Sequence, residues 1–215
     1  MQLSVGETLG RYEIQAELGS GGMGTVYEAI DNTLQRKVAI KVLKPNAITD
    51  ADGVERFKRE VKAIAGLSHP NIISLYDFAE QEGTHYAVME FADGTTLDKC
   101  IESFSRNRAI EIALGMAEGL SAAHDGGIIH RDIKPSNIII TSTNKVKILD
   151  FGLAAVHAGP SLEEDTLAAG ELKTQIGTVM GTAGYMSPEQ VRGRKADKRS
   201  DIFSFGVTMY ETLTG

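Results

Sequence analysis

Four side chains with the chemistry to hold a metal ion and a phosphate lie near one another in the sequence. Asp132, Lys134 and Asn137 come before, and Asp150 after, a stretch in which two short apolar runs flank the polar residues 142–144. This pattern is typical of a β-hairpin, which brings its two ends together. Two carboxylates and an amide beside an ammonium suit a divalent cation that holds a phosphate. The alternative is a pair of polar turns that only cap the hairpin, but ordinary turns do not need this many chemical groups in order.

A glycine-rich segment is the second candidate. Residues 19–24 read Gly-Ser-Gly-Gly-Met-Gly between two runs rich in β-forming residues, 12–18 and 25–31. Glycines at this density indicate a backbone that turns sharply or approaches a ligand closely. In a dinucleotide-binding fold a helix would follow the glycines, whereas here another predicted strand follows. The pattern therefore favours a hairpin that covers phosphates, with a merely flexible turn as the alternative.

A lysine inside an apolar strand is the third candidate. The alternation of the predicted strand 36–43 directs Ala39 and Lys41 to the same face. A buried ammonium needs a partner. The next predicted element, a helix over about 53–67, offers Glu60 at the edge of its apolar stripe. A Lys41–Glu60 pair would hold the ammonium ready for phosphate oxygens; the alternative is a structural ion pair without a ligand.

Further patterns predict the elements that must position these groups. Residues 72–79 and 84–91 predict two more strands, which brings the first 92 residues to five strands and one main helix. The stretch after them, 93–95, has the composition of a short linker. Apolar residues at helical spacing then predict helices over about 101–127 and 201–213.

Between these two helices the composition changes. Residues 153–181 are rich in Ala, Gly, Thr and acidic residues, and a loop of this length is usually functional or disordered. His124, near the predicted end of the first helix, carries no sign of a special role. The fold class is therefore predicted to be α+β, with a β-rich region at 1–92 and a mainly helical region at 93–215.

Bulk properties narrow the function classes. The chain of 215 residues is long enough for one domain or a small two-lobed unit. Its net charge of -7 and pI of about 5.3 provide no basic field for nucleic acid or an anionic membrane. The single cysteine, Cys100, cannot form an internal disulfide. No apolar run reaches the roughly 18 residues of a membrane helix, and the N-terminus lacks a signal-peptide pattern. We expect a soluble, cytoplasmic protein that does not bind nucleic acid.

Six segments in order resemble the eukaryotic-type (Hanks-type) protein kinases, which also occur in bacteria. They are the glycine loop with Val26, Val-Ala-Ile-Lys at 38–41, Glu60, His-Arg-Asp at 130–132 with Asn137, Asp-Phe-Gly at 150–152, and Ser-Pro-Glu at 187–189, where the family more often has Ala-Pro-Glu. The match runs from about Tyr12 to the end. The resemblance implies a two-lobed fold, with a five-stranded antiparallel N-lobe and one main helix at 1–92 and a mainly helical C-lobe at 93–215.

The resemblance also implies roles for the four polar side chains around the predicted hairpin. Asp132 would accept the proton of the substrate hydroxyl, and Lys134 would neutralise charge on the transferring phosphoryl group. Asn137 and Asp150 would bind Mg²⁺. A lysine at position 134 resembles serine/threonine kinases rather than tyrosine kinases.

ATP would be held by the N-lobe and its junction with the C-lobe. Lys41, oriented by Glu60, would bind the α- and β-phosphates, the backbone of Glu90 and Ala92 would bind the adenine edge, and Met89 would lie behind it. The residues implied in ATP binding are Leu18, Gly19, Ser20, Gly21, Gly22, Met23, Gly24, Val26, Ala39, Lys41, Glu60, Glu90, Ala92 and Ile139.

Arg131 implies regulation. In kinases with this arginine, a phosphorylated threonine of the following loop pairs with it and orders the loop. Thr174 and Thr178 are the candidate sites, phosphorylated in trans by a second copy in a homodimer. Family catalytic domains usually continue to about 250–280 residues. The C-lobe is therefore expected to be incomplete, without the later arginine that would pair with Glu189.

Three functions fit these observations. The first is an ATP- and Mg²⁺-dependent kinase that phosphorylates serine and threonine hydroxyls of proteins. The second is a nucleotide-binding scaffold, or pseudokinase, against which the intact Lys41, Asp132, Asn137 and Asp150 count. The third is a small-molecule kinase of the aminoglycoside phosphotransferase type. The segments Lys134-Pro135, Phe151-Gly152 and Ser187-Pro188-Glu189 favour a protein substrate over a small molecule.

Overall fold

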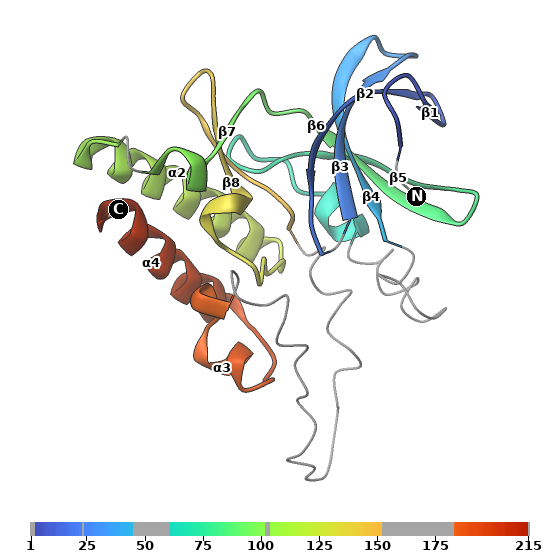
Figure 1. Cartoon of the computed structure of the whole chain (residues 1–215). Coiled ribbons are helices and arrows are strands. Elements are labelled where there is room, and N and C mark those ends of the chain that lie inside the picture. Colours follow the sequence, from blue (N-terminus) through green and yellow to red (C-terminus); the bar gives the residue numbers. More distant parts are fainter. Residues whose placement is uncertain (1–2, 23, 45–60, 102–103, 152–182, 215) are drawn as a thin grey trace, which may run out of the picture.

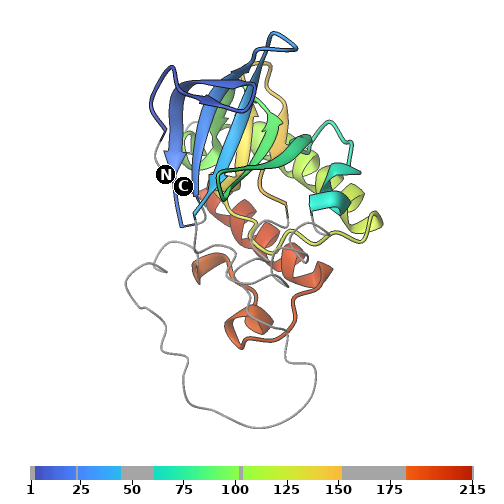
Figure 2. The same cartoon turned by 90° about the vertical axis from the view of Figure 1, so that its right-hand side faces the viewer.

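The computed structural model describes residues 3–22, 24–44, 61–101, 104–151 and 183–214. The described residues form an N-terminal antiparallel sheet and a second part made of helices and a small sheet (Figure 1). The N-terminal sheet lies at the upper right of Figure 1 and at the top of Figure 2, and α3 and α4 lie lower than the sheet in both views. Two hydrophobic cores correspond to this arrangement.

The N-terminal sheet contains all five predicted strands and a short sixth one. Every neighbouring pair is antiparallel, and the strand order is β1-β2-β3-β4-β6-β5. The strands are β1 (Thr8–Leu9), β2 (Tyr12–Ser20), β3 (Gly24–Asp31), β4 (Arg36–Leu43), β5 (Leu75–Gln81) and β6 (Thr84–Glu90). β5 begins three residues after the predicted Ile72, because Ile72 and Ile73 pair instead with Ile148 of the second part.

The two faces of this sheet differ in burial. Val38, Ile40 and Val42 alternate along β4 on one face, where they pack with Ile14 and Tyr27 in a buried core. Alternate residues of a strand point to opposite faces. Ala39 and Lys41 therefore lie on the other face, which is the arrangement that the sequence predicted.

The second part is built around a hairpin and two long helices. The predicted hairpin is confirmed as β8 (Ile138–Thr141) and β9 (Val146–Ile148), joined at its outer edge by β7 (Gly94–Thr96). The helices are α2 (Arg106–Asp125), α3 (Pro188–Val191) and α4 (Lys198–Thr214), with 3-10 turns η2 (Leu97–Lys99), η4 (Pro135–Asn137) and η6 (Ala183–Tyr185).

Local caps explain where the long helices begin. The Ser105 hydroxyl accepts a hydrogen bond from Arg108 N, so α2 starts at Arg106 rather than at the predicted Ile101. Asp197 Oδ1 accepts a hydrogen bond from Arg199 N at 2.8 Å, and α4 starts at Lys198, three residues before the predicted Asp201. The helix predicted over 53–67 is described only in part, with residues 61–65 helical.

The predicted linker at 93–95 is wrong in part, because Gly94 begins β7. A Cβ atom on Gly94 would lie 2.3 Å from the Ile140 carbonyl oxygen, so only glycine allows this pairing with β8. The long loop predicted over 153–181 lies outside the described residues. Among the described residues, none of the helices has the length and apolar composition needed to cross a membrane.

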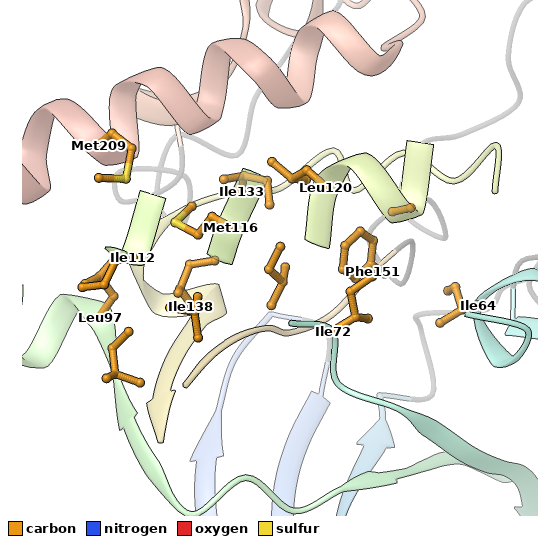
Figure 3. Packing of buried hydrophobic residues seen from close by; sticks show 14 residues of the cluster. Ile64, Ile72, Leu97, Ile112, Met116, Leu120, Ile133, Ile138, Phe151 and Met209 are labelled. Atoms are coloured by element: carbon orange, nitrogen blue, oxygen red, sulfur yellow. The ribbon is translucent and has the colours of Figure 1, made fainter. Parts of the chain in front are cut away.

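The larger core joins the hairpin, α2 and α4. Figure 3 shows Met209 of α4 pointing toward Met116 of α2, with Ile138 of the hairpin close by. Gly119 lets α2 approach the hairpin, since a Cβ atom there would lie 2.9 Å from Ile148 Cδ1. Phe151, which follows the hairpin, belongs to the same core. The core therefore fixes both ends of the stretch that carries the candidate site.

Candidate active site

The hairpin brings its two ends together, as the sequence predicted. Ile138 pairs with Ile148, and Leu149 N donates a hydrogen bond of 2.8 Å to the carbonyl oxygen of Asn137. Asn137 and the residue before Asp150 are thus in direct contact. The turn Pro135–Asn137 precedes β8 and carries Asn137, while Lys134 and Asp132 come just before the turn.

The Asp132 carboxylate is contacted by the two other candidate groups that come before β8. Lys134 Nζ lies 2.8 Å from Asp132 Oδ2. Asn137 Nδ2 donates to the same oxygen at 3.0 Å and to the carbonyl oxygen of Asp132 at 2.7 Å. Within the described residues, both side-chain contacts with the Asp132 carboxylate fall on Oδ2. Oδ1 is therefore the oxygen that can accept a hydrogen bond from another molecule. Because the Asn137 nitrogen is used in this way, its amide oxygen is the atom that can bind a cation.

Lys41 and Asp150 form the second half of the site. Lys41 Nζ lies 2.7 Å from Asp150 Oδ2, and the lysine side chain is buried while that of Asp150 is 28% exposed. The predicted partner of Lys41, Glu60, lies outside the described residues. The contact joins β4 of the N-terminal sheet to the end of the hairpin, so it connects the two parts of the molecule.

The register of the sheet gathers the candidate nucleotide residues on one face. Val26 is paired with Lys41 across β3 and β4, and Ala39 with Met89 across β4 and β6. Residues directly opposite in an antiparallel pair point to the same face. This face therefore carries Val26, Ala39, Lys41 and Met89 together.

Apolar side chains of this set remain accessible. Leu18 is 47% exposed, and Val26, Ala39 and Ile139 are half-buried. On the opposite face of β4, Val38 is completely buried. Accessible apolar side chains beside a buried ammonium have the chemistry of a site for a flat apolar ring that carries phosphates.

The glycine loop is closed by a narrow turn. Gly21 N donates to the carbonyl oxygen of Gly24 at 2.9 Å, between the end of β2 and the start of β3. Gly24 is required by packing, because a Cβ atom there would lie 2.1 Å from the Val42 carbonyl oxygen. A Cβ atom at Gly21 would meet nothing within 4 Å. Packing within the described protein does not account for glycine at 21, whereas a ligand that lies against the backbone would. Met23 of this loop lies outside the described residues.

The junction between the two parts carries a polar cluster that sequence reasoning missed. Glu90 at the end of β6 accepts from Lys147 Nζ at 2.6 and 2.8 Å, and from Ser74 N at 3.2 Å. Glu90 N donates to the Ser74 carbonyl oxygen at 2.9 Å, so only the carbonyl oxygen of Glu90 is a candidate contact for an adenine edge. Ala92 lies in the stretch between β6 and β7. The signal in the sequence was a lysine between Val146 and Ile148, the same pattern that drew attention to Lys41.

Two residues of the site have strained backbones. Arg131 has φ of 70° and Asp150 has φ of 56°, values that non-glycine residues rarely adopt. Such conformations cost about 1–3 kcal/mol each and persist where the surroundings fix them.

Asp201 of α4 fixes the backbone at Arg131. Its Oδ1 accepts from Arg131 N at 2.7 Å, and its Oδ2 accepts from His130 N at 2.8 Å. The same Oδ2 lies 2.8 Å from His124 Nε2, so His124, which the sequence gave no special role, helps to hold this carboxylate. No pattern in the sequence predicts that contact.

His130 is neutral and structural. Nε2 donates to the Leu149 carbonyl oxygen at 2.6 Å, and Nδ1 accepts from Asp132 N at 3.2 Å, so one tautomer satisfies both contacts. The ring packs edge-on against Phe151 with centroids 4.7 Å apart. Burial lowers the pKa of His130. Protonation would also turn Nδ1 into a donor, although it accepts a hydrogen bond from Asp132 N.

The segment that follows the undescribed stretch is anchored to both α4 and the site. Ser187 caps α3 through a reciprocal pair of hydrogen bonds with Gln190. Gln190 Nε2 also donates to the Arg131 carbonyl oxygen at 2.7 Å. Glu189 accepts from Ser200 Oγ at 2.5 Å, and this hydrogen bond lowers the pKa of Glu189.

Tyr185 is fixed in the same segment. Its hydroxyl donates to Glu211 at 2.5 Å, and Ser204 Oγ donates to its carbonyl oxygen at 2.7 Å. Burial and the contact with Glu211 raise the pKa of Tyr185 to about 12. The candidate regulatory threonines, Thr174 and Thr178, and Gly152 lie outside the described residues, while Arg131 is placed beside Asp132.

The donors present fit Mg²⁺ held jointly with phosphates. The described residues contain no group of three or more His, Cys, Asp or Glu side chains that could hold a metal alone. Asp150 and the amide oxygen of Asn137 are hard oxygen donors, and Mg²⁺ commonly binds through one or two protein oxygens together with phosphates and waters.

Comparison with known proteins decides the family. The family model described as "Protein kinase domain" matches residues 12–215. The chain belongs to the protein kinase family. It is a kinase domain of the bacterial Hanks type, which confirms the family and the class of enzyme predicted from the sequence.

Two mycobacterial kinases are similar to this kinase domain. It is 43% identical over 225 residues to the serine/threonine-protein kinase PknA of Mycobacterium tuberculosis (strain ATCC 25618 / H37Rv), covering 100% of this chain and 49% of PknA. It is 43% identical over 212 residues to PknB of the same strain, covering 95% of this chain and 32% of PknB. The kinase domain thus spans half or less of the length of these relatives.

Solved structures confirm the two-lobed fold. One crystal structure of the M. tuberculosis PknI kinase domain matches with a TM-score of 0.76 and 25% identity, over 98% of this chain and 75% of that one. A second crystal structure of the same kinase domain matches with a TM-score of 0.74 and 26% identity, over 97% of this chain and 76% of that one.

Proposed function

We propose that this kinase domain transfers the γ-phosphate of ATP to serine and threonine hydroxyls of proteins in a Mg²⁺-dependent reaction. One observation carries the proposal: the hairpin β8–β9 brings Asp132, Lys134 and Asn137 to one end of a site whose other end is the Lys41–Asp150 pair. Phosphoryl transfer depends mainly on positioning and on neutralisation of charge, and these groups supply both.

Asp132 would orient and deprotonate the substrate hydroxyl. Asn137 Nδ2 and Lys134 Nζ both bind its Oδ2, which fixes the carboxylate and directs Oδ1 to the incoming hydroxyl. Lys134 lies close enough to Asp132 to contact the phosphoryl group that the hydroxyl attacks. Its charge would offset the charge on the equatorial oxygens during transfer.

Lys41 and the glycine loop would hold the rest of the nucleotide. The buried ammonium of Lys41 suits the α- and β-phosphates, and the backbone at Gly21 leaves room for phosphate oxygens. The accessible apolar side chains of Leu18, Val26, Ala39 and Ile139 would suit the adenine ring. The carbonyl oxygen of Glu90 and the backbone of Ala92 would bind its polar edge.

Asp150 and Asn137 would hold Mg²⁺. The chemistry that the ion would supply there is neutralisation of the phosphate charge. Asp150 lies between Lys41 and the hairpin, so it is placed to orient the phosphates that Lys41 contacts. Its strained backbone fits a residue whose position is set by function rather than by local preference.

Labelled phosphate from ATP distinguishes this function from the two rivals. We expect transfer to a generic protein substrate, with acid hydrolysis of the product giving phosphoserine and phosphothreonine. Mg²⁺-dependent ATP binding without transfer to any acceptor would support the scaffold. Transfer to an aminoglycoside but not to protein would support the small-molecule kinase.

We further propose that phosphorylation of Thr174 or Thr178 controls the activity by pairing with Arg131. The support is the place of Arg131 beside Asp132, with a backbone held by Asp201. A phosphate carries three acceptor oxygens that suit a guanidinium. Peptide mapping after incubation with ATP should find phosphate on one of these threonines; phosphate found only elsewhere would contradict the proposal.

The remaining predictions are also proposals. We infer that residues 1–92 act as the N-lobe and 93–215 as the C-lobe, that the domain works in the cytoplasm, and that two copies phosphorylate each other. Phosphorylation in trans should let the parent chain transfer labelled phosphate to a tagged Asp132→Asn copy once the two have been mixed and have exchanged subunits. Label found only on the parent chain would contradict it.

A further inference from the structure

The peptide unit between Arg131 and Asp132 is held at both of its edges. Its carbonyl oxygen, that of Arg131, accepts from Gln190 Nε2 at 2.7 Å. Its N–H group, that of Asp132, donates to His130 Nδ1 at 3.2 Å. Because a peptide unit is planar, these two contacts together set the plane from which the Asp132 side chain departs.

This peptide unit follows a strained residue. Arg131 has φ of 70°, which a residue with a Cβ atom adopts only when its surroundings fix it. Arg131 N donates to Asp201 Oδ1 at 2.7 Å, so α4 holds one side of the strained residue and Gln190 of α3 holds the other. The direction of Asp132 therefore depends on α3 as well as on α4.

The side-chain amide of Gln190 is oriented by its own helix. Its Oε1 accepts from Ser187 N at 3.0 Å and from Ser187 Oγ at 3.1 Å. With the amide oxygen used twice by Ser187, the amide nitrogen is turned to the Arg131 carbonyl. A single side chain thus caps α3 through its amide oxygen and binds the Arg131 carbonyl through its amide nitrogen.

We propose that Gln190 is a positioning residue for Asp132. Through its hydrogen bond to the Arg131 carbonyl, the position of α3 sets the direction of the Asp132 side chain, the proposed catalytic base. The proposal rests on the proposed function for the role of Asp132. The segment 183–191, which contains α3, directly follows the stretch with the candidate regulatory threonines.

The competing explanation is that Gln190 only caps α3. The two tasks use different atoms of the amide, so substitutions separate them. Gln190→Glu keeps an acceptor for Ser187, and glutamate is a standard residue at this capping position, but it cannot donate to Arg131. Ser187→Ala removes the hydroxyl of the cap but keeps Ser187 N as a donor to Gln190 Oε1, so Nε2 stays directed at the Arg131 carbonyl. The same substitution creates the Ala-Pro-Glu motif more common in the family.

Steady-state kinetics of the full chain with a protein substrate test the proposal. Gln190→Glu should lower kcat about 10-fold, since small misplacements of a catalytic group cost up to about 10²-fold. KM for ATP should stay within about 2-fold, because Lys41 and the glycine loop are not touched. Ser187→Ala should lower the thermal midpoint by a few degrees and leave kcat within about 2-fold. An unchanged kcat in Gln190→Glu, or an equal loss in Ser187→Ala, would overturn the proposal.

Amide NMR provides a test that does not depend on activity. In Gln190→Glu the ¹⁵N–¹H resonance of Asp132 should shift and its hydrogen exchange should accelerate, while Ser187→Ala should leave both as in the parent chain. If the parent chain transfers no phosphate but the Asp132 amide responds, the contact stands and the proposed function fails. If the Asp132 amide does not respond to Gln190→Glu, the positioning role is wrong whatever the activity.

Discussion

The ammonium of Lys41 on β4 lies 2.7 Å from a carboxylate oxygen of Asp150, which follows the hairpin β8–β9. The contact joins the two lobes through the two groups proposed to hold the phosphates and the metal. We therefore expect loss of either group to affect both the proposed binding of ATP and the alignment of the lobes.

Replacement of Lys41 by methionine removes a buried ammonium proposed to bind phosphates and leaves Asp150 without this partner. We expect kcat/KM to fall by about 10²–10³-fold, the usual effect of losing one preorganised electrostatic contact. The matched control is Lys37→Met on the same strand, since Lys37 is exposed and pairs with Glu28. Initial rates at several ATP concentrations measure both; similar losses in the two variants would contradict the role of Lys41.

Two glycines of the same loop should respond differently to alanine. Gly24→Ala places a Cβ atom 2.1 Å from the Val42 carbonyl oxygen, and overpacking of this kind typically costs about 1–3 kcal/mol of unfolding free energy. Gly21→Ala meets no protein atom within 4 Å, so stability should change by less than about 0.5 kcal/mol. KM for ATP should nevertheless rise in Gly21→Ala. Urea denaturation and ATP titrations measure the two effects; an unchanged KM in Gly21→Ala would show that no phosphate approaches this backbone.

The Glu90–Lys147 pair should stabilise the junction between the lobes. Both side chains are mostly buried, at 24% and 13% exposure. A double-mutant cycle with Glu90→Gln and Lys147→Met should give a coupling energy of about 1 kcal/mol in urea denaturation, after allowance for solvent screening. The control cycle is Arg108–Glu111, in which the glutamate side chain is 65% exposed and for which we expect less than about 0.5 kcal/mol. Equal coupling in the two cycles would contradict a special role for Glu90.

His130 should make stability fall in mild acid. Burial lowers its pKa in the folded state, while in the unfolded state it titrates near its ordinary value of about 6.5. Below pH 6.5 the unfolded state therefore binds a proton that the folded state resists. This removes up to about 1.4 kcal/mol of unfolding free energy per pH unit. NMR titration of the histidine Cε1 resonances checks the cause, and a His130 that titrates at or above its ordinary value would exclude it.

Local patterns predicted most of the elements. Runs rich in β-forming residues between turn signals identified the five strands, and two apolar runs around a polar turn identified the hairpin. Alternation along the strand 36–43 identified the face that carries Ala39 and Lys41. β7 was missed because three residues beginning with glycine carry no such pattern, and their pairing depends on the close approach of Gly94 to β8. The first turn of α4 was missed because it begins before the apolar residues of the helix. Asp197 is identified as its cap only by the hydrogen bond from Arg199 N.

Three contacts between distant segments could not be predicted from the sequence. Asp201 with His124, Glu90 with Lys147 and Gln190 with Arg131 each join elements far apart in the chain. None of them follows from periodicity or propensity, since only the packing of the lobes brings the partners together. Lys147 was the one partner with a local signal, a charged residue inside an apolar strand.

The most direct test of the account is single-turnover transfer of labelled γ-phosphate from Mg-ATP to a protein substrate, with the parent chain compared with Asp132→Asn. Asparagine keeps the shape of the carboxylate but cannot accept the hydroxyl proton. We expect phosphoserine and phosphothreonine with the parent chain, a rate about 10²–10⁴-fold lower with Asp132→Asn, and equal affinity of both for Mg-ATP. Equal rates of transfer, or ATP binding by the parent chain without any transfer, would contradict it.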